Sequence, residues 1–174
     1  SWTISMWTKT VHTDNENLFV KYGSGGGFFL KMYDTNYFYV NDGTHTVFRY
    51  WDTAWSDGQW HLITMVINRN TNLIDLYIDG VLHNGGGGGN IAGFGSITTT
   101  ANLNLYGATN GRHDEFTVST NVRDDSWIKT SYNNQNDPSS FYTFGVEEKN
   151  PLSNKAPILS GENPTNNSGN ININ

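Results

Sequence analysis

The chain has 174 residues and a formal net charge of −6, with ten Lys and Arg residues against sixteen Asp and Glu. So few basic residues, scattered along the sequence, exclude the dense cationic surface that nucleic-acid binding requires. The absence of cysteine excludes disulfides, thiolate metal sites and a cysteine nucleophile. No apolar run approaches the roughly 18 residues that cross a bilayer, so we expect no membrane insertion.

The first fifty residues read as short β-strands. Trp2, Ile4 and Met6 fall on one face of the opening strand, whereas Trp7 falls on the other face together with Thr and Ser. Gly- and Asn-rich turns at 23–27 and 41–43 predict hairpins between the runs that follow. These runs cover residues 17–22, 27–34, 36–42 and 45–52.

The middle of the chain gives the strongest strand signal. Residues 62–67 are apolar on both faces, which predicts a central strand, and Asp79-Gly80 predicts a tight hairpin after the next one. Trp60 falls on the same side as Leu62, so we expect it in the core together with its neighbour His61. Two further strands are predicted within 101–108 and 112–120.

Five consecutive glycines occupy positions 85–89 in "NGGGGGN". A phosphate-binding loop is excluded because no Lys followed by Ser or Thr opens a helix after them. Glycine loses more backbone freedom on folding than any other residue, so such a run is costly to order. The sequence therefore predicts a flexible loop at the rim, or one packed closely against a neighbouring subunit.

One helix is predicted, within residues 123–135, with Asp124 or Asp125 as its N-cap. A last strand is predicted at 140–148. About eleven strands and one short helix indicate an all-β fold, a two-sheet antiparallel jelly-roll sandwich. Residues 1–148 form this domain. The extended tail of residues 149–174 has no aromatic residue, three of the four prolines and eight asparagines, which is typical of a linker.

The segments "SWTISMWTKT", "DGQWHLITMVIN", "LYIDGVL" and "HDEF" in this order resemble the LamG-like, concanavalin A-like jelly-roll family. They are most similar to a prokaryotic subgroup of large cell-surface proteins, often found beside a DUF2341 domain. The resemblance implies an extracellular or cell-surface location. Relatives usually carry further strands before the "TISMW" strand, so the N-terminal sheet edge is expected to be incomplete unless another segment fills it. The tail resembles the linker and first strand of an immunoglobulin-like module.

The resemblance does not bring a catalytic motif with it. Glycosidases of this fold carry Glu, Asp and Glu at alternating strand positions, and no such run occurs in the sequence. We therefore expect no enzyme, with a glycoside hydrolase as the remote alternative. The five histidines lack metal-ligand spacing. Many relatives are implied to hold a structural calcium ion, for which Asp114 is the candidate ligand; the alternative is that Asp114 caps a turn.

Carbohydrate binding needs exposed aromatic rings beside polar groups. Tyr50, Trp51 and Trp55 surround a loop with two nearby aspartates and are the candidates for it, against the alternative that these rings fill the core. The predicted function is a non-catalytic recognition or adhesion module of a larger surface protein that binds glycans or proteins. The alternative is a structural subunit of an extracellular filament, in which the tail of one copy adds a strand to another.

Overall fold

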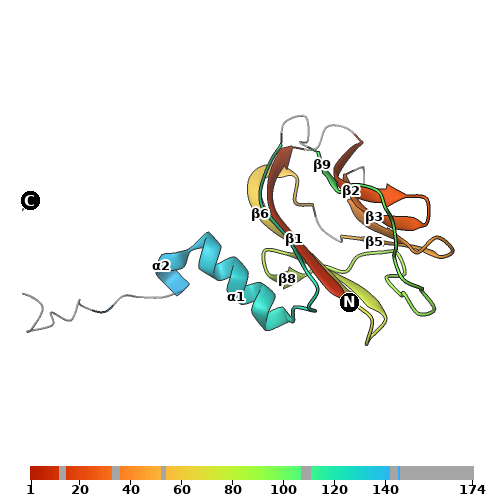
Figure 1. Ribbon diagram of the computed structural model, residues 1–174. Coiled ribbons are helices and arrows are strands. Elements are labelled where there is room, and N and C mark those ends of the chain that lie inside the picture. Colours follow the sequence, from red (N-terminus) through yellow and green to blue (C-terminus); the bar gives the residue numbers. More distant parts are fainter. Residues whose placement is uncertain (12–14, 33–35, 52–53, 107–110, 142–144, 146–174) are drawn as a thin grey trace, which may run out of the picture. The chain divides into compact units, whose positions relative to one another are not determined.

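A computed structural model of the chain describes residues 1–11, 15–32, 36–51, 54–106, 111–141 and 145 (Figure 1). The chain divides into two units, Ser1–Tyr142 and Thr143–Asn174, and every helix and strand below belongs to the first. The predicted boundary at residue 148 and the predicted tail of 149–174 lie outside the described residues.

Two antiparallel five-stranded sheets face each other, which confirms the predicted sandwich. Sheet A has the order β10-β1-β6-β7-β8 and sheet B the order β5-β4-β3-β2-β9. The strands of sheet A are β10 (Arg112–Ser119), β1 (Trp2–Val11), β6 (Asp57–Asn68), β7 (Leu73–Ile78) and β8 (Val81–Leu82). Those of sheet B are β5 (Thr46–Tyr50), β4 (Tyr37–Asn41), β3 (Gly26–Met32), β2 (Glu16–Gly23) and β9 (Asn104–Leu105).

The core lies between the sheets and follows from strand alternation. Ile63, Met65 and Ile67 of β6 are fully buried there, opposite aromatic side chains of sheet B such as Phe19 and Phe38. β1 lies between β10 and β6, so β10 is the segment that fills the sheet edge beside the first strand.

The helix α1 (Asp125–Asn136) packs on the outer face of sheet A. Asp124 is its N-cap and accepts a hydrogen bond from the Trp127 backbone N–H at 2.8 Å, as predicted. Ile128 is 1% exposed and clusters with Val66 and Tyr77 of the sheet. β6 is therefore covered on both faces, by sheet B and by α1, which explains its continuous apolar sequence.

A second helix, α2 (Pro138–Phe141), occupies the start of the segment 140–148, where a strand is predicted. Pro138 suits a first helical position, and Asp137 accepts a hydrogen bond from the Ser140 backbone N–H at 3.2 Å. The strand prediction is thus wrong for 140–141, and nearly all of its remainder lies outside the described residues. Neither helix in the described part of the chain has the length and apolar character needed to cross a bilayer.

The glycine run is packed against its own chain instead of forming a free rim loop. Gly85 N–H donates to the Tyr50 carbonyl and Tyr50 N–H donates to the Gly86 carbonyl, both at 2.9 Å. Gly87 has φ +81°, and a Cβ there would lie 2.3 Å from the Phe48 carbonyl oxygen. Glycine is required because backbone meets backbone at this point.

Candidate functional site

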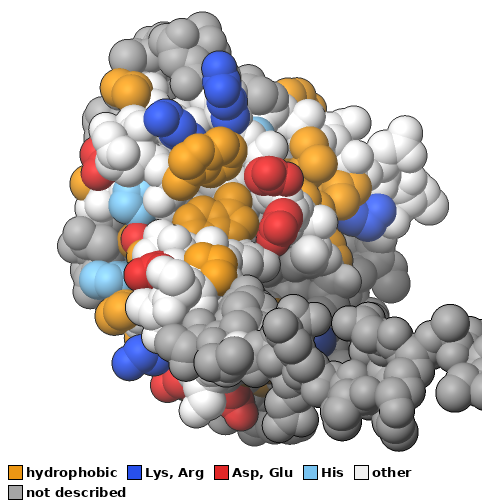
Figure 2. All heavy atoms as spheres, turned by 90° about the vertical axis from the view of Figure 1, so that its left-hand side faces the viewer, with side chains coloured by type: hydrophobic (Ala, Val, Ile, Leu, Met, Phe, Trp, Pro, Cys, Tyr) orange, Lys and Arg blue, Asp and Glu red, His pale blue; other side chains and the backbone are white. Residues whose placement is uncertain are grey.

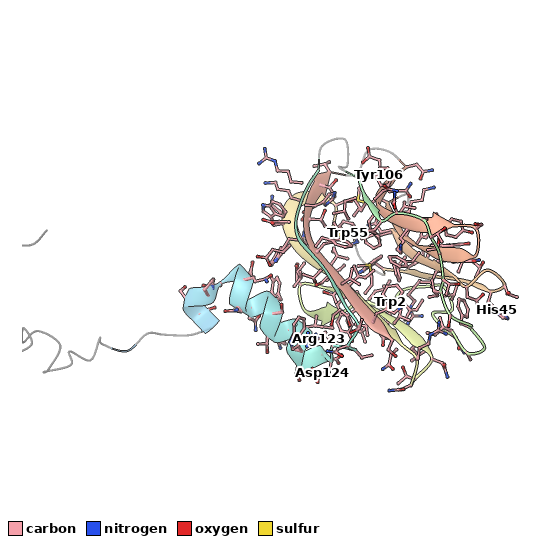
Figure 3. The ribbon with its side chains drawn as sticks, viewed as in Figure 1. Trp2, His45, Trp55, Tyr106, Arg123 and Asp124 are labelled. Atoms are coloured by element: carbon pink, nitrogen blue, oxygen red, sulfur yellow. The ribbon has the colours of Figure 1, made fainter. Side chains whose placement is uncertain are left out.

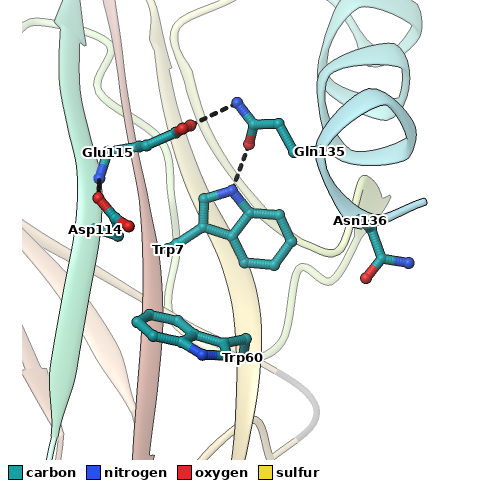
Figure 4. Close-up of a pocket in the computed structure, with 6 residues that line it drawn as sticks. All are labelled: Trp7, Trp60, Asp114, Glu115, Gln135 and Asn136. Carbon is teal, nitrogen blue, oxygen red and sulfur yellow. Dashed lines mark hydrogen bonds between the residues drawn. The ribbon is translucent and has the colours of Figure 1, made fainter. Parts of the chain in front are cut away.

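An open pocket of about 330 Å³ lies on the outer face of sheet A, where α1 ends (Figure 4). It is lined by Trp7, Trp60, Asp114, Glu115, Gln135 and Asn136. Figure 2, which views the molecule from the side of α1, shows hydrophobic and acidic side chains next to each other there, with basic side chains close by. The pocket thus combines aromatic rings, carboxylates and amides in one concave surface.

Strand register places both tryptophans on the outer face. Trp7 of β1 pairs with Leu62, and Lys9 pairs with Trp60, so alternation along both strands directs the two indoles outward. Trp60 is 41% exposed, so the expectation that it packs in the core is wrong. α1 covers the outer face of β6 at Val66 but ends at Asn136, at the edge of the pocket.

The helix fixes the orientation of Trp7. Tyr132 stacks on the Trp7 ring, with centroids 5.8 Å apart and planes inclined by 28°. The Trp7 indole N–H donates to the Gln135 side-chain oxygen, and the Gln135 amide N–H donates to Glu115 Oε2 at 2.6 Å. The ring is therefore held by hydrogen bonds and stacking before any ligand arrives.

A β-bulge brings both carboxylates to the pocket. Trp7 pairs with Asp114 and Ser5 pairs with Thr117, so β10 has one residue more than β1 across this interval. Glu115, in that interval, has φ +49°, and its backbone N–H donates to Asp114 Oδ1 at 2.8 Å. The bulge lets two residues adjacent in sequence line the same pocket.

The arrangement is suited to holding a ligand through rings, carboxylates and amides. Hydrolysis of a glycosidic bond requires two carboxyl groups on opposite sides of the scissile bond. Asp114 and Glu115 both come from β10, whereas the α1 wall of the pocket carries the amides of Gln135 and Asn136. An amide does not donate and recover a proton at neutral pH, so no described side chain opposite the carboxylates completes a catalytic pair.

His61 supports the strand segment next to Trp60. Its Nδ1 lies 2.7 Å from Asp79 Oδ2 and its Nε2 lies 3.1 Å from Asp57 Oδ1. Burial alone would lower the pKa of His61, but the hydrogen bonds to the two carboxylates outweigh it and raise the pKa above its ordinary value of 6.5. Sequence reasoning missed this cluster, since the hairpin alone explained Asp79.

The sequence model of the concanavalin A-like lectin/glucanases superfamily matches residues 1–129. The chain belongs to this superfamily. The match confirms the resemblance at that level, and the prokaryotic subgroup with its DUF2341 neighbour stays a prediction. No curated protein sequence matches the chain.

Solved structures similar to this superfamily member include receptor-binding domains of botulinum neurotoxins. The serotype G binding domain matches with a TM-score of 0.60 and 13% identity over 75% of this chain and 35% of its own. A second structure concerns the dependence of botulinum neurotoxin type C cell entry on two ganglioside molecules. It matches with a TM-score of 0.59 and 14% identity over 83% of this chain and 36% of its own. The type DC binding domain in complex with SialylT matches with a TM-score of 0.58 and 14% identity over 76% of this chain and 35% of its own. The chain spans about a third of each of these proteins, and identities this low show the shared fold alone.

In this superfamily member the predicted sugar-binding rings lie away from the pocket. Trp55 is fully buried between the sheets (Figure 3), and Trp51 is 6% exposed and packs edge-on against it with centroids 6.0 Å apart. Neither ring presents a face to solvent, so the prediction of exposed rings is wrong for both. Tyr50 is half-buried on the outer face of sheet B, beside Tyr37 and Phe48.

Calcium binding at Asp114 stays a prediction. Calcium takes six to eight oxygen ligands. Within the described ranges no three acidic or histidine side chains come together as a metal site, and Glu115 is the one other carboxylate that lines the pocket with Asp114. Among the described residues, acidic side chains alone therefore do not form a calcium site at Asp114.

Proposed function

We propose that the chain is a non-catalytic glycan-binding module of an extracellular protein, and that its binding site is the pocket of Trp7 and Trp60. The observation that carries the proposal is the juxtaposition of an indole that is 41% exposed with two carboxylates and two amides in one open pocket. Small-molecule sites combine aromatic walls with a few convergent polar groups in this way.

Sugar rings match this chemistry. Their C–H faces stack on an indole, and their hydroxyls donate to carboxylates and exchange hydrogen bonds with amides. The site carries Asp114 and Glu115, and the whole chain has a net charge of −6. The two carboxylates are the charged groups that line the pocket itself, whereas the basic side chains lie beside it, so we infer a neutral glycan as the ligand.

Affinity electrophoresis against a panel of soluble glucans, galactans, xylans and mannans tests the proposal. We expect at least one neutral polysaccharide to retard the wild-type chain, and Trp60→Ala to abolish the retardation. Tyr22→Ala is the matched control, because Tyr22 is 42% exposed but lies on β2 of the other sheet.

Two results would contradict the proposal. One is the absence of retardation on every member of the panel. The other is retention of binding by Trp60→Ala together with its loss in Tyr22→Ala, which would move the site to sheet B. Release of reducing ends from a bound polysaccharide would overturn the non-catalytic assignment and favour a glycoside hydrolase.

A filament subunit is the second candidate function. β10 is an eight-residue strand that pairs only with β1 among the described strands, so one of its edges is open to strand addition. The bulge at Glu115 interrupts that edge, which counts against a long pairing partner. Deleting residues 156–174 abolishes polymers if tails join the copies. Polymers that persist after the deletion, or a wild-type chain that sediments as a monomer, refute this candidate.

A further inference from the structure

A second hollow, of about 480 Å³, lies on the same outer face of sheet A near the N-terminal end of α1. The side chains of Thr3, Ser5, Thr117, Ser119, Arg123 and Trp127 line it. Four of these six side chains carry a hydroxyl group, and Trp127 is 41% exposed. Like the pocket at Trp60, it pairs one accessible indole with polar side chains.

Arg123 is held in place at this hollow. Its guanidinium carbon lies 4.3 Å from the centroid of the Trp127 ring, and its backbone N–H donates to Thr3 Oγ1 at 3.1 Å. Figure 3 shows Arg123 beside the helix cap Asp124. The Nε of Arg123 is buried and has no hydrogen-bond partner in the described part of the chain. Because Nε is inaccessible, a ligand would meet the terminal N–H groups of the guanidinium, which lies over the Trp127 ring.

The two hollows follow one another along the same strands. Thr3, Ser5 and Trp7 alternate along the outer face of β1, and their partners on β10 are Ser119, Thr117 and Asp114. The four-residue step from Thr3 to Trp7 corresponds to about 14 Å along a strand. Along α1, Trp127 and Gln135 are eight residues apart, about 12 Å along the helix axis. Strand and helix thus form two roughly matching walls.

One exposed hydrogen bond joins two residues that line the pocket at Trp60, from the Gln135 amide of α1 to Glu115 Oε2 of β10 at 2.6 Å. Ser5 Oγ and Thr117 Oγ1, which line the second hollow, share another exposed hydrogen bond of 2.8 Å. Exposed side-chain hydrogen bonds contribute little net stability because water replaces them. The hydroxyls of a bound sugar replace them equally well, so these contacts do not prevent a ligand from spanning both hollows.

We infer that the two hollows are one groove for an extended oligosaccharide, with Arg123 and Trp127 forming a distal subsite. This inference rests on the proposed function and adds the length of the ligand to it. Asp124 and Asp125 lie directly after Arg123 in the chain, so the charge at this end is not positive overall. The distal subsite therefore also takes a neutral sugar, through hydroxyl acceptors for Arg123 and stacking on Trp127.

The test is the dependence of affinity on ligand length. Isothermal titration would compare neutral gluco- and galacto-oligosaccharides of two and of six units on the wild-type chain, Trp127→Ala and Trp60→Ala. We expect the six-unit ligand to bind the wild type about tenfold more tightly than the two-unit ligand, because a further aromatic anchor contributes energy of this order to binding. Trp127→Ala removes this advantage and leaves the two-unit affinity unchanged, whereas Trp60→Ala weakens both ligands. Trp127→Phe, which keeps a ring, restores most of the advantage.

Equal affinities for two and six units overturn the inference while leaving the pocket at Trp60 in place. So does a six-unit affinity that Trp127→Ala does not change, provided that circular dichroism shows the variant folded. Equal losses for both lengths in Trp127→Ala also overturn it, because they indicate a general effect through α1. Absence of binding at every length defeats the proposed function itself, and the groove with it.

Discussion

Both sheets have five strands, but the aromatic residues on their outer faces are arranged differently. On sheet A, α1 buries part of the face and leaves Trp60 exposed at the helix end. On sheet B, a set of six rings spreads over four strands with no described helix above it. We call this set the aromatic face; it comprises Tyr22, Phe29, Tyr37, Tyr39, Phe48 and Tyr50.

The rings of the aromatic face pack mainly on each other. Phe29 and Tyr39 are cross-strand partners and stack with centroids 4.4 Å apart, and Tyr22 contacts Tyr39 edge-on at 5.6 Å. Such pairs add about 0.5–1.5 kcal/mol beyond the area that they bury. Trp60 makes no ring pair with any described aromatic residue. Exposed rings thus occur on both outer faces, and the faces differ in whether an exposed ring has an aromatic neighbour.

The largest expected effect is on the free energy of unfolding, and it tests the burial of Trp55 in the core. Trp55→Ala removes a fully buried indole and should lower the free energy of unfolding by about 3–5 kcal/mol. Urea denaturation followed by circular dichroism measures it. A variant of unchanged stability that loses glycan retention would restore Trp55 to the binding role that the sequence predicts and would contradict its burial.

The next largest effects compare the outer faces of the two sheets directly. Phe29→Ala should lower stability by about 1–3 kcal/mol because two stacked rings lose contact, while glycan retention stays unchanged. Trp60→Ala should do the reverse, with stability within about 0.5 kcal/mol of wild type and retention lost. If Phe29→Ala removes retention without destabilising the fold, the aromatic face binds the ligand.

A smaller effect concerns pH and the strand that carries Trp60. His61 has a raised pKa when folded, so its contribution to stability is complete below its unfolded pKa near 6.5 and is lost as pH rises through the folded pKa. His113 acts in the opposite direction, because burial lowers its pKa. Comparing the stability of wild type with that of His61→Gln between about pH 5 and pH 8 isolates the contribution of His61. We expect the difference in unfolding free energy to shrink as pH rises; a constant difference would refute the charged cluster.

The smallest expected effect is that of calcium. A site filled at a hundredfold excess over Kd stabilises a protein by about 2.7 kcal/mol. Among the described residues, Asp114 is not part of a group of three His, Asp or Glu side chains that could hold a metal ion. We therefore expect thermal unfolding midpoints in calcium and in a chelator to agree within about 1 °C, and Asp114→Asn to behave like wild type in both. A calcium-dependent rise that Asp114→Asn removes would establish the site that the family resemblance implies.

Alternation along the chain predicted most of the fold and half of the site. It placed Trp7 on the polar face of the first strand, assigned β6 to the centre of its sheet, and located α1 with its cap at Asp124. These features depend on local periodicity and capping, which neighbouring residues alone determine. Asp114 was selected only through the family resemblance, as a calcium ligand.

The other half of the site depends on which element covers which face. Trp60 was predicted in the core and Trp51 and Trp55 at the surface, and the structure reverses all three. α1 follows β6 by more than fifty residues, so nothing local to Trp60 reveals that the helix ends before covering it. Gln135 and the bulge at Glu115 were missed for the same reason, because their roles arise only when β10 and α1 meet.

The packing of the glycine run has a consequence for the solubility of the domain. By pairing with Tyr50, Gly85 and Gly86 occupy the outermost backbone groups of β5, the last strand of sheet B. An uncovered terminal strand invites pairing with a second molecule and, from there, aggregation. Gly85 and Gly86 thus occupy this part of the edge, beside a surface rich in aromatic rings.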